Sequence, residues 1–460
     1  MSALSFTSLP LPQPLLANLD ALGYVEMTPI QAQTLPTILS GKDVIGQSET
    51  GSGKTVAFAL GILNNLQPQN LSIQALVLCP TRELATQVAA ETRRLARSIN
   101  NVKVTVICGG TPIKRQIDSL KHGTHIVIGT PGRIEDHLRR QTLELGKIKV
   151  CVLDEADRML DMGFEEAISN IASELSANRQ TLLFSATFPV EIQHVAKQLL
   201  TNSSHIKIEP AKTTPRIRQA FYNTSDANRL QTLMALLATE QPLSCLVFCQ
   251  TRQQSKDVQI ALHNKGYNAL ALHGEMEPRD RDQALVRFAN NSVTILVATD
   301  VAARGLDIDQ LELVINYQLP NDPNNYIHRI GRTGRAGNSG QAITLVTEHD
   351  RTKLDNLSAT IKQAITTSQL PKIDTDSARV TAAPMVTLLI YGGKKSKLRA
   401  GDILGALTGE SGIDGKHVGK IQLYPNHAYV AVAKEYAERA IKKLKTDKIK
   451  GKSFRIQTLV

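Results

Sequence analysis

Residues 48–55 read SETGSGKT and combine the groups that can hold a nucleotide phosphate. Glycines let backbone N–H groups turn toward phosphate oxygens, Lys54 can reach the β- and γ-phosphates, and the Thr55 hydroxyl can bind Mg²⁺. The general pattern has glycine where this chain has Ser48, a small residue at the start of the loop. A glycine-rich turn is the alternative. We predict a site for ATP and Mg²⁺ that includes Ser48, Glu49, Thr50, Gly51, Ser52, Gly53, Lys54 and Thr55.

A pair of carboxylates follows about a hundred residues later, where the apolar run VCVL ends in DEAD. In open parallel sheets, ligands bind at the carboxyl ends of the strands, so Asp154 and Glu155 should lie near the phosphate loop. Asp154 is suited to hold Mg²⁺, and Glu155 to orient and deprotonate an attacking water. Capping of the next helix could explain either residue alone, but not both together with the loop.

A second cluster of charge lies in HRIGRTGRAG, where Arg329, Arg332 and Arg335 alternate with glycines. Arginine carries a permanently charged fork that can stabilise charge developing on a γ-phosphate. The alternative is an ordinary basic surface loop. With the metal and the base in one domain and the arginines in another, hydrolysis would require a cleft between them to close.

Strands and helices must position these groups, and the sequence contains two series of apolar, strand-like runs that alternate with helical segments. Apolar, β-branched runs occur near Val44, at 75–79, 125–130, 149–157 and 181–187, and then at 245–251, 294–300, 312–318 and 341–347. Helical segments alternate with them, which predicts two α/β domains with parallel sheets covered on both faces. The polar stretch 201–219 separates the two series, and we expect the junction within 203–218.

A second polar break at 371–384 precedes a smaller module. The order expected beyond it is strand, helix, two strands, helix and strand, which fits a small ferredoxin-like α+β sandwich of the kind that includes RNA-recognition modules. We therefore predict α/β domains at 1–208 and 209–372, a linker at 373–384 and a C-terminal RNA-recognition-like domain at 385–460.

Charge is distributed unevenly along the 460 residues. Positions 381–460 contain 15 Lys and Arg against 6 Asp and Glu, so this segment holds +9 of the total charge of +11. A basic module on a nearly neutral body suggests nucleic acid as the partner, although a solvated lysine-rich surface is the alternative. The five cysteines lack C-x-x-C spacing, which favours buried thiols in a reducing cytosol. We expect a cytoplasmic monomer without a membrane partner.

Together these motifs resemble those of the DEAD-box RNA helicase family over about residues 5–350, in the family's order. GYVEMTPIQ at 23–31 looks like the family's adenine-reading motif, although Tyr24 replaces a more usual phenylalanine. By this resemblance Gln31 contacts the base, Phe6 is the upstream stacking aromatic, and Thr28 belongs to the nucleotide site. Ser48 departs from the family's usual alanine by one atom. The resemblance also implies tandem RecA-like domains and RNA-stimulated ATP hydrolysis.

Further motifs carry the family's RNA contacts, coupling segment and arginine fingers. The resemblance assigns Arg332 and Arg335 as fingers and Asp307 to the nucleotide site. Ser185, Ala186 and Thr187 match the segment that couples hydrolysis to unwinding. The predicted RNA contacts of the two domains are Pro80, Thr81, Arg82, Gly110, Thr130, Arg133, Thr251, Arg252, Gly274 and Thr299. Such contacts address the phosphate backbone, so they position RNA without reading its sequence.

The basic module is then the expected source of specificity, with Lys394, Lys395, Lys397 and Arg399 just before its first helix and a second basic run at 434–452. Its strand at 427–433 lacks the usual aromatic RNA-binding pattern, and Tyr429 could stack on bases or belong to the core. Chain and module resemble a bacterial subfamily specific for a hairpin in large-subunit ribosomal RNA. That resemblance implies 23S rRNA, during assembly of the large subunit, as substrate. An ATP-gated RNA clamp, a general RNA helicase and a DNA helicase remain alternatives.

Overall fold

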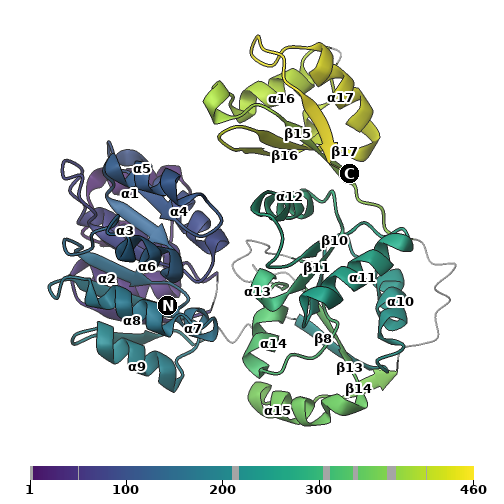
Figure 1. The fold of residues 1–460 in the computed structure, drawn as a ribbon, viewed down its shortest axis with the longest axis horizontal. Helices are drawn as coiled ribbons and strands as arrows, with labels where there is room; N and C mark the ends of the chain where they lie inside the picture. Colours follow the sequence, from purple (N-terminus) through teal and green to yellow (C-terminus); the bar gives the residue numbers. More distant parts are fainter. Residues whose placement is uncertain are drawn as a thin grey trace. The chain divides into compact units, whose positions relative to one another are not determined.

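The computed structural model describes residues 4–49, 51–209, 217–303, 311–334, 340–369, 380–410 and 412–459. These residues form two parallel sheets of seven strands and one antiparallel sheet of four strands (Figure 1). The elements group into two compact units, the first built on the first sheet and the second on the other two. The predicted fold class, two tandem α/β domains with a small α+β module, is confirmed.

The first sheet has the strand order β3-β4-β2-β5-β6-β1-β7, and all of its pairings are parallel. Its strands are β1 (Val44–Gln47), β2 (Ala75–Leu78), β3 (Val104–Ile107), β4 (Ile126–Gly129), β5 (Val150–Leu153), β6 (Gln180–Ser185) and β7 (Ser204–Lys207). Its helices are α1 (Gln13–Ala21), α2 (Pro29–Leu39), α3 (Lys54–Asn64), α4 (Arg82–Leu95), α5 (Ile113–Lys121), α6 (Pro131–Arg139), α7 (Ala156–Asp161), α8 (Glu165–Ser173) and α9 (Val190–Leu199).

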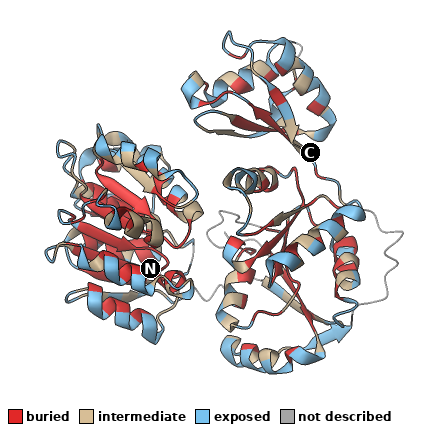
Figure 2. Ribbon diagram, viewed as in Figure 1, coloured by how far each residue is buried: buried red, intermediate tan, exposed pale blue. Residues whose placement is uncertain are grey.

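Burial on both faces explains the apolar runs of the central strands. All four residues of β2, β4 and β5 are buried (Figure 2). One apolar cluster forms on each face of the sheet, with Val77 and Val152 in one and Leu76 and Leu153 in the other. Successive side chains of a strand point to opposite faces, so a strand covered by helices on both sides must be apolar throughout.

The second sheet repeats this architecture with the order β10-β11-β9-β12-β13-β8-β14. Its strands are β8 (Ile217–Asn223), β9 (Cys245–Cys249), β10 (Ala269–Leu272), β11 (Ile295–Thr299), β12 (Leu313–Asn316), β13 (Gly340–Val346) and β14 (Thr367–Gln369). Its helices are α10 (Arg229–Glu240), α11 (Arg252–Asn264), α12 (Pro278–Ala289), α13 (Asp300–Ala303), α14 (Pro323–Ile330) and α15 (Arg351–Ile361). All five cysteines are buried and unpaired, as predicted.

The third sheet belongs to the basic module and has the order β16-β17-β15-β18. The chain runs through β15 (Met385–Ile390), α16 (Ala400–Thr408), β16 (Val418–Leu423), β17 (Ala428–Ala433), α17 (Ala437–Thr446) and β18 (Ile456–Leu459). This is the predicted order of elements. Leu388 and Val430 of the sheet pack with Ile403 and Leu407 of α16 and with Leu444 of α17.

One part of the expected strand pattern was wrong. The stretch 201–219, read as a polar connection, contains β7 and the start of β8. Strands β3, β10 and β14 were also missed. Strands β3, β7, β10 and β14 lie at the edges of their sheets, and β8 pairs with β14. Edge strands are less buried, so they do not need continuous apolar sequence.

Candidate nucleotide and RNA site

The phosphate loop lies between β1 and α3, as its sequence context predicted. Gly51 and Gly53 have φ angles of 82° and 95°, a region that side-chain-bearing residues rarely adopt. A Cβ atom on Gly53 would lie 2.5 Å from Gln31 Nε2. Glycine is therefore required here both by backbone conformation and by the close approach of a neighbour.

Hydrogen bonds within the loop fix the side chains that the sequence singled out. Lys54 is buried and donates from Nζ to the carbonyl of Ser48 at 2.8 Å. The hydroxyls of Ser48 and Ser52 lie 2.7 Å apart, and Ser52 donates to the carbonyl of Glu49 at 2.8 Å. Ser48, the residue that departs from the general pattern, thus holds the loop together through its own hydroxyl. Thr55 lies in the first turn of α3, while Thr50 lies outside the described residues.

Gln31 connects the phosphate loop to the N-terminus of α2. Its Nε2 donates to the carbonyl of Gly53 at 3.0 Å, and its Oε1 accepts from the Thr28 N–H at 2.9 Å. The amide retains one donor and one acceptor position beyond these bonds. Phe6, predicted to stack on a base, is buried in the apolar core and contacts the edge of Tyr24, with ring centroids 6.4 Å apart.

The two carboxylates follow β5, two strands from β1 in the sheet. Burial, reinforced by the nearby Glu155, raises the pKa of Asp154 to about 7, although Lys54 opposes this shift. Glu155 has a left-handed backbone, with φ 53°, at the start of α7. Its Oε2 lies 3.1 Å from the guanidinium of Arg158 and is buried without a hydrogen-bond donor among the described residues. The base candidate is thus held beside Arg158, and this oxygen accepts no hydrogen bond from the described residues.

The last residue of DEAD contacts the segment after β6. Asp157 Oδ2 accepts from the backbone N–H groups of Ala186 and Thr187 and from the Thr187 hydroxyl, at 2.9–3.2 Å. The Asp157 N–H donates to Ser185 Oγ at 3.3 Å, and Ser185 O accepts from the Ser48 N–H at 3.1 Å. The predicted coupling residues therefore join the carboxylate segment to the phosphate loop. The sequence reasoning named neither Asp157 nor Arg158 as a site residue, although both adjoin the recognised carboxylates.

The residues of this site fit ATP with Mg²⁺. The loop leads into the N-terminus of α3, where helix N–H groups favour anions, and Gly53 at the start of this helix has the left-handed backbone that such a turn requires. Asp154 is a buried carboxylate whose ionisation is unfavourable without a cation. Carboxylate and hydroxyl oxygens are suitable ligands for Mg²⁺.

The RNA motifs predicted for the first domain lie along the other half of the same sheet. They follow β2, β3 and β4, which are adjacent, whereas the nucleotide motifs follow the adjacent strands β5, β6 and β1. The Arg82 guanidinium lies against Gly110, where it would clash with any Cβ. Arg133 donates to Thr111 O at 2.9 Å and to Gln116 Oε1 at 3.0 Å. The remaining predicted contacts of this domain, also at strand ends, are Pro80, Thr81 and Thr130.

The second unit places its predicted RNA residues in the same way, after the adjacent strands β9, β10 and β11. Thr251 caps α11 by accepting from the Gln254 N–H at 3.1 Å, and Arg252 pairs with Glu275 at 2.6 Å. Gly274 follows β10, and Thr299 ends β11.

One arginine of the glycine-rich segment, Arg329, forms contacts within its own sheet. Arg329 is buried and forms two hydrogen bonds with Asp300, at 2.6 and 2.7 Å. It also donates to Asn316 Oδ1 and to Gln318 O, so it holds the ends of β11 and β12 together. Arg332 is buried near the end of α14, whereas Asp307 and Arg335 lie outside the described residues.

In the basic module, Lys394, Lys395, Lys397 and Arg399 are all exposed. Tyr429 is only 1% exposed and forms an apolar cluster with Leu389 of β15 and Val286 of α12. At the end of α12, Ser292 and Thr387 have hydroxyls 2.6 Å apart. Of the two roles that the sequence allowed for Tyr429, stacking on bases or packing in the core, the structure shows packing.

Comparison with known proteins agrees with this geometry. The DEAD/DEAH box helicase family matches residues 28–195, the helicase conserved C-terminal domain residues 228–337, and the DbpA RNA binding domain residues 387–458. The chain is 50% identical over 449 residues to the ATP-dependent RNA helicase DbpA of Escherichia coli K12, covering 98% of each chain. The chain belongs to the DEAD-box family of ATP-dependent RNA helicases.

Other relatives share the helicase core. The helicase is 44% identical to the ATP-dependent RNA helicase CshA of Limosilactobacillus reuteri, over 75% of this chain and 70% of the relative. Saccharomyces cerevisiae Dbp5 bound to RNA and ADP BeF3 superposes with a TM-score of 0.72 at 30% identity, over 81% of this chain and 97% of that one. Within the described residues, no helix has the length and apolar character needed to cross a membrane.

Proposed function

We propose that this helicase remodels short duplexes in 23S ribosomal RNA during assembly of the large ribosomal subunit, acting as a monomer in the cytoplasm. The observation that carries the proposal is the C-terminal module, which matches the DbpA RNA binding domain over residues 387–458. The module holds +9 of the chain's net charge of +11, and phosphate contacts provide affinity for RNA of any sequence. Selection of a particular hairpin then requires additional contacts to bases.

We assign the catalytic roles on the same basis. Thr55 and Asp154 would hold Mg²⁺, which when bound offsets the negative charge of the phosphates. Lys54 binds the β- and γ-phosphates, Glu155 deprotonates the attacking water, and Gln31 reads adenine. Arg332 and Arg335 supply positive charge to the γ-phosphate, and Asp307 belongs to the same site. The backbone of the RNA is held by the residues at strand ends described above and by Lys394, Lys395, Lys397 and Arg399.

The proposal is tested by steady-state ATP hydrolysis with the full chain. A large-subunit rRNA fragment should stimulate hydrolysis at a much lower concentration than an unrelated RNA of equal length. Displacement of a short strand placed beside the hairpin should depend on ATP. Equal stimulation by both RNAs would make the protein a general RNA helicase. Hydrolysis without strand displacement would instead indicate an ATP-gated clamp.

A further inference from the structure

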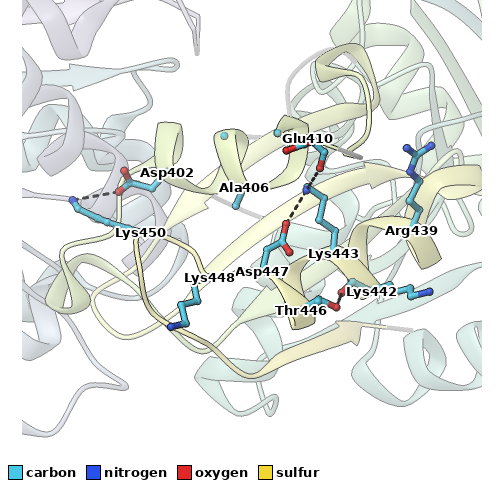
Figure 3. Close-up of a pocket in the computed structure, with 12 residues that line it drawn as sticks. Asp402, Ala406, Glu410, Arg439, Lys442, Lys443, Thr446, Asp447, Lys448 and Lys450 are labelled. Carbon is cyan, nitrogen blue, oxygen red and sulfur yellow. Dashed lines mark hydrogen bonds and ion pairs between the residues drawn. The ribbon is translucent and has the colours of Figure 1, made fainter.

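Two groups of polar side chains have no role in the site described above. One group lines a cavity in the basic module, between α16, α17 and the segment that follows α17 (Figure 3). There Lys443 pairs with Asp447 at 2.8 Å and Lys450 with Asp402 at 3.5 Å. In each pair one side chain is about half exposed, and ion pairs open to water contribute little stability. The second group is buried in the first domain beside a predicted RNA contact, where hydrogen bonds can hold a single arrangement.

Gln116 of α5 is the centre of the buried group. It is 5% exposed, and its Nε2 donates to the carbonyl of Cys108 at 2.8 Å, in the segment that leads from β3 to Gly110. Its Oε1 accepts from Arg133 Nη1 at 3.0 Å and lies 3.0 Å from His137 Nε2. Gln116 therefore joins two segments that carry predicted RNA contacts, the one after β3 and the one that begins α6.

His137 of α6 fixes the orientation of the Gln116 amide. The amide oxygen has to face Arg133, because the amide nitrogen already donates to a carbonyl. His137 Nε2 must then donate to that oxygen, while Nδ1 lies 2.8 Å from the hydroxyl of Thr142. Burial, reinforced by the nearby Arg133, lowers the pKa of His137. At neutral pH an uncharged ring with its proton on Nε2 therefore holds Gln116 in place.

The Arg133 guanidinium is held along one side. Its Nη1 donates to Gln116 Oε1 and to the carbonyl of Thr111 at 2.9 Å, so both hydrogens of this nitrogen are used within the domain. Its Nε lies 3.9 Å from Asp136, and Nη2 forms no hydrogen bond with the described residues. The side chain is 18% exposed. The Nη2 group therefore remains for a phosphate oxygen, at a position set through Nη1.

We propose that Gln116, held by His137, is a positioning residue that sets Arg133 for contact with the RNA backbone. An arginine that is free in the unbound protein loses rotamer freedom when it binds, whereas an arginine that is already held loses less. Such preorganisation raises affinity without adding a contact to the ligand. The inference rests on the RNA contact proposed for Arg133, and it does not depend on which RNA is the substrate.

Gln116→Met in the full chain is the first test, because methionine has a similar size but forms none of the three hydrogen bonds. Binding of labelled oligouridine, a single-stranded RNA, is measured by fluorescence anisotropy with a non-hydrolysable ATP analogue. Affinity should fall about tenfold. The slope of log affinity against log salt should become shallower by roughly 0.7, the effect of one lost phosphate contact. Because the substitution removes no charge, this change in slope reports on Arg133.

Gln74→Met is the matched control. Gln74 is 3% exposed and also forms three hydrogen bonds, with Gln67 and Asn70, just before β2 begins. The predicted RNA contacts follow the other end of that strand. Thermal unfolding of both variants checks that they fold, and Gln74→Met should match the parent in RNA affinity and in salt slope. Equal changes in RNA binding for the two variants would overturn the proposal.

Two substitutions of His137 test how Gln116 is held. His137→Phe keeps a ring of similar size but removes the donor to Gln116, and should weaken binding of oligouridine about fivefold. His137→Gln restores an N–H donor near the Nε2 position and should bind within about twofold of the parent. Equal affinities of the two variants would contradict the role assigned to His137.

Arg133→Met separates this inference from the proposed RNA contact. If Arg133→Met binds oligouridine as the parent does, Arg133 is not an RNA contact, and the positioning role fails with it. If Arg133→Met weakens binding and Gln116→Met does not, the positioning role fails alone. A residue that acts through Arg133 adds nothing once Arg133 is gone, so the double variant should bind like Arg133→Met. Additive losses would overturn the proposal, because Gln116 would then affect RNA by another route.

Discussion

Thr187 donates two hydrogen bonds to one oxygen of Asp157, from its backbone N–H and from its hydroxyl, each 2.9 Å long. The two residues are 30 positions apart and follow the adjacent strands β5 and β6. Ser185, in the same segment, contacts both Asp157 and the phosphate loop. The carboxylates are thus connected to the segment after β6 through hydrogen bonds to a charged group, which are among the stronger ones in proteins.

We predict that Thr187→Val lowers ATP-dependent strand displacement about tenfold but lowers RNA-stimulated ATP hydrolysis by less than about threefold, because it removes one hydrogen bond to a charged group. The control is Thr181→Val on β6, the strand that precedes Thr187, since the buried Thr181 hydroxyl has no hydrogen-bond partner among the described residues. It should leave both activities unchanged. A parallel fall in hydrolysis and displacement would refute the coupling role.

Glu155→Gln should retain ATP binding and lower hydrolysis by at least about 100-fold, because an amide cannot accept the proton of the attacking water. Binding is measured with a fluorescent ATP analogue, and turnover by phosphate release with saturating RNA. Glu165→Gln, at an exposed position in the first turn of α8, serves as the matched control. Undiminished turnover of Glu155→Gln would exclude this residue as the base.

Gln31→Ala tests whether the Gln31 amide contacts the adenine base directly or affects ATP binding only through its hydrogen bond to the phosphate loop. The variant loses the bonds to Thr28 and Gly53, so ATP affinity should fall about tenfold. If Gln31 also contacts the base, the preference for ATP over GTP should narrow. The affinities of both nucleotides are compared by competition against a fluorescent analogue. An equal loss for ATP and GTP would leave Gln31 a purely structural role.

Arg329→Met should destabilise the second sheet by about 3 kcal/mol, because it leaves Asp300 without its buried partner. Hydrogen exchange of β11 and β12 in the full chain measures this local free energy of unfolding. The matched control is Arg252→Met, which breaks an ion pair whose two side chains are 58% and 52% exposed. Exposed pairs contribute about 1 kcal/mol or less. Equal effects of the two substitutions would contradict the structural role assigned to Arg329.

The sequence determined the central architecture and the chemistry of the nucleotide site. A strand buried on both faces must be apolar throughout, so β2, β4 and β5 could be recognised from residue types alone. The phosphate loop and the carboxylates are also local patterns, because the functional groups of each motif lie within a few consecutive residues. Charge suggested a nucleic acid as partner, and the order of the motifs, through their resemblance to the DEAD-box family, specified RNA.

Tertiary structure alone decided three further features. The edge strands β3, β7, β10 and β14 depend on pairing with a neighbour, which leaves a weak pattern in sequence. Arg329 and Arg332 look equivalent in sequence, but Arg329 becomes a structural residue because Asp300 lies beside it in space. Tyr429 became a packed residue only because α12, more than a hundred positions earlier, covers it. Contacts between distant parts of the chain assigned these roles, and no local pattern encodes such contacts.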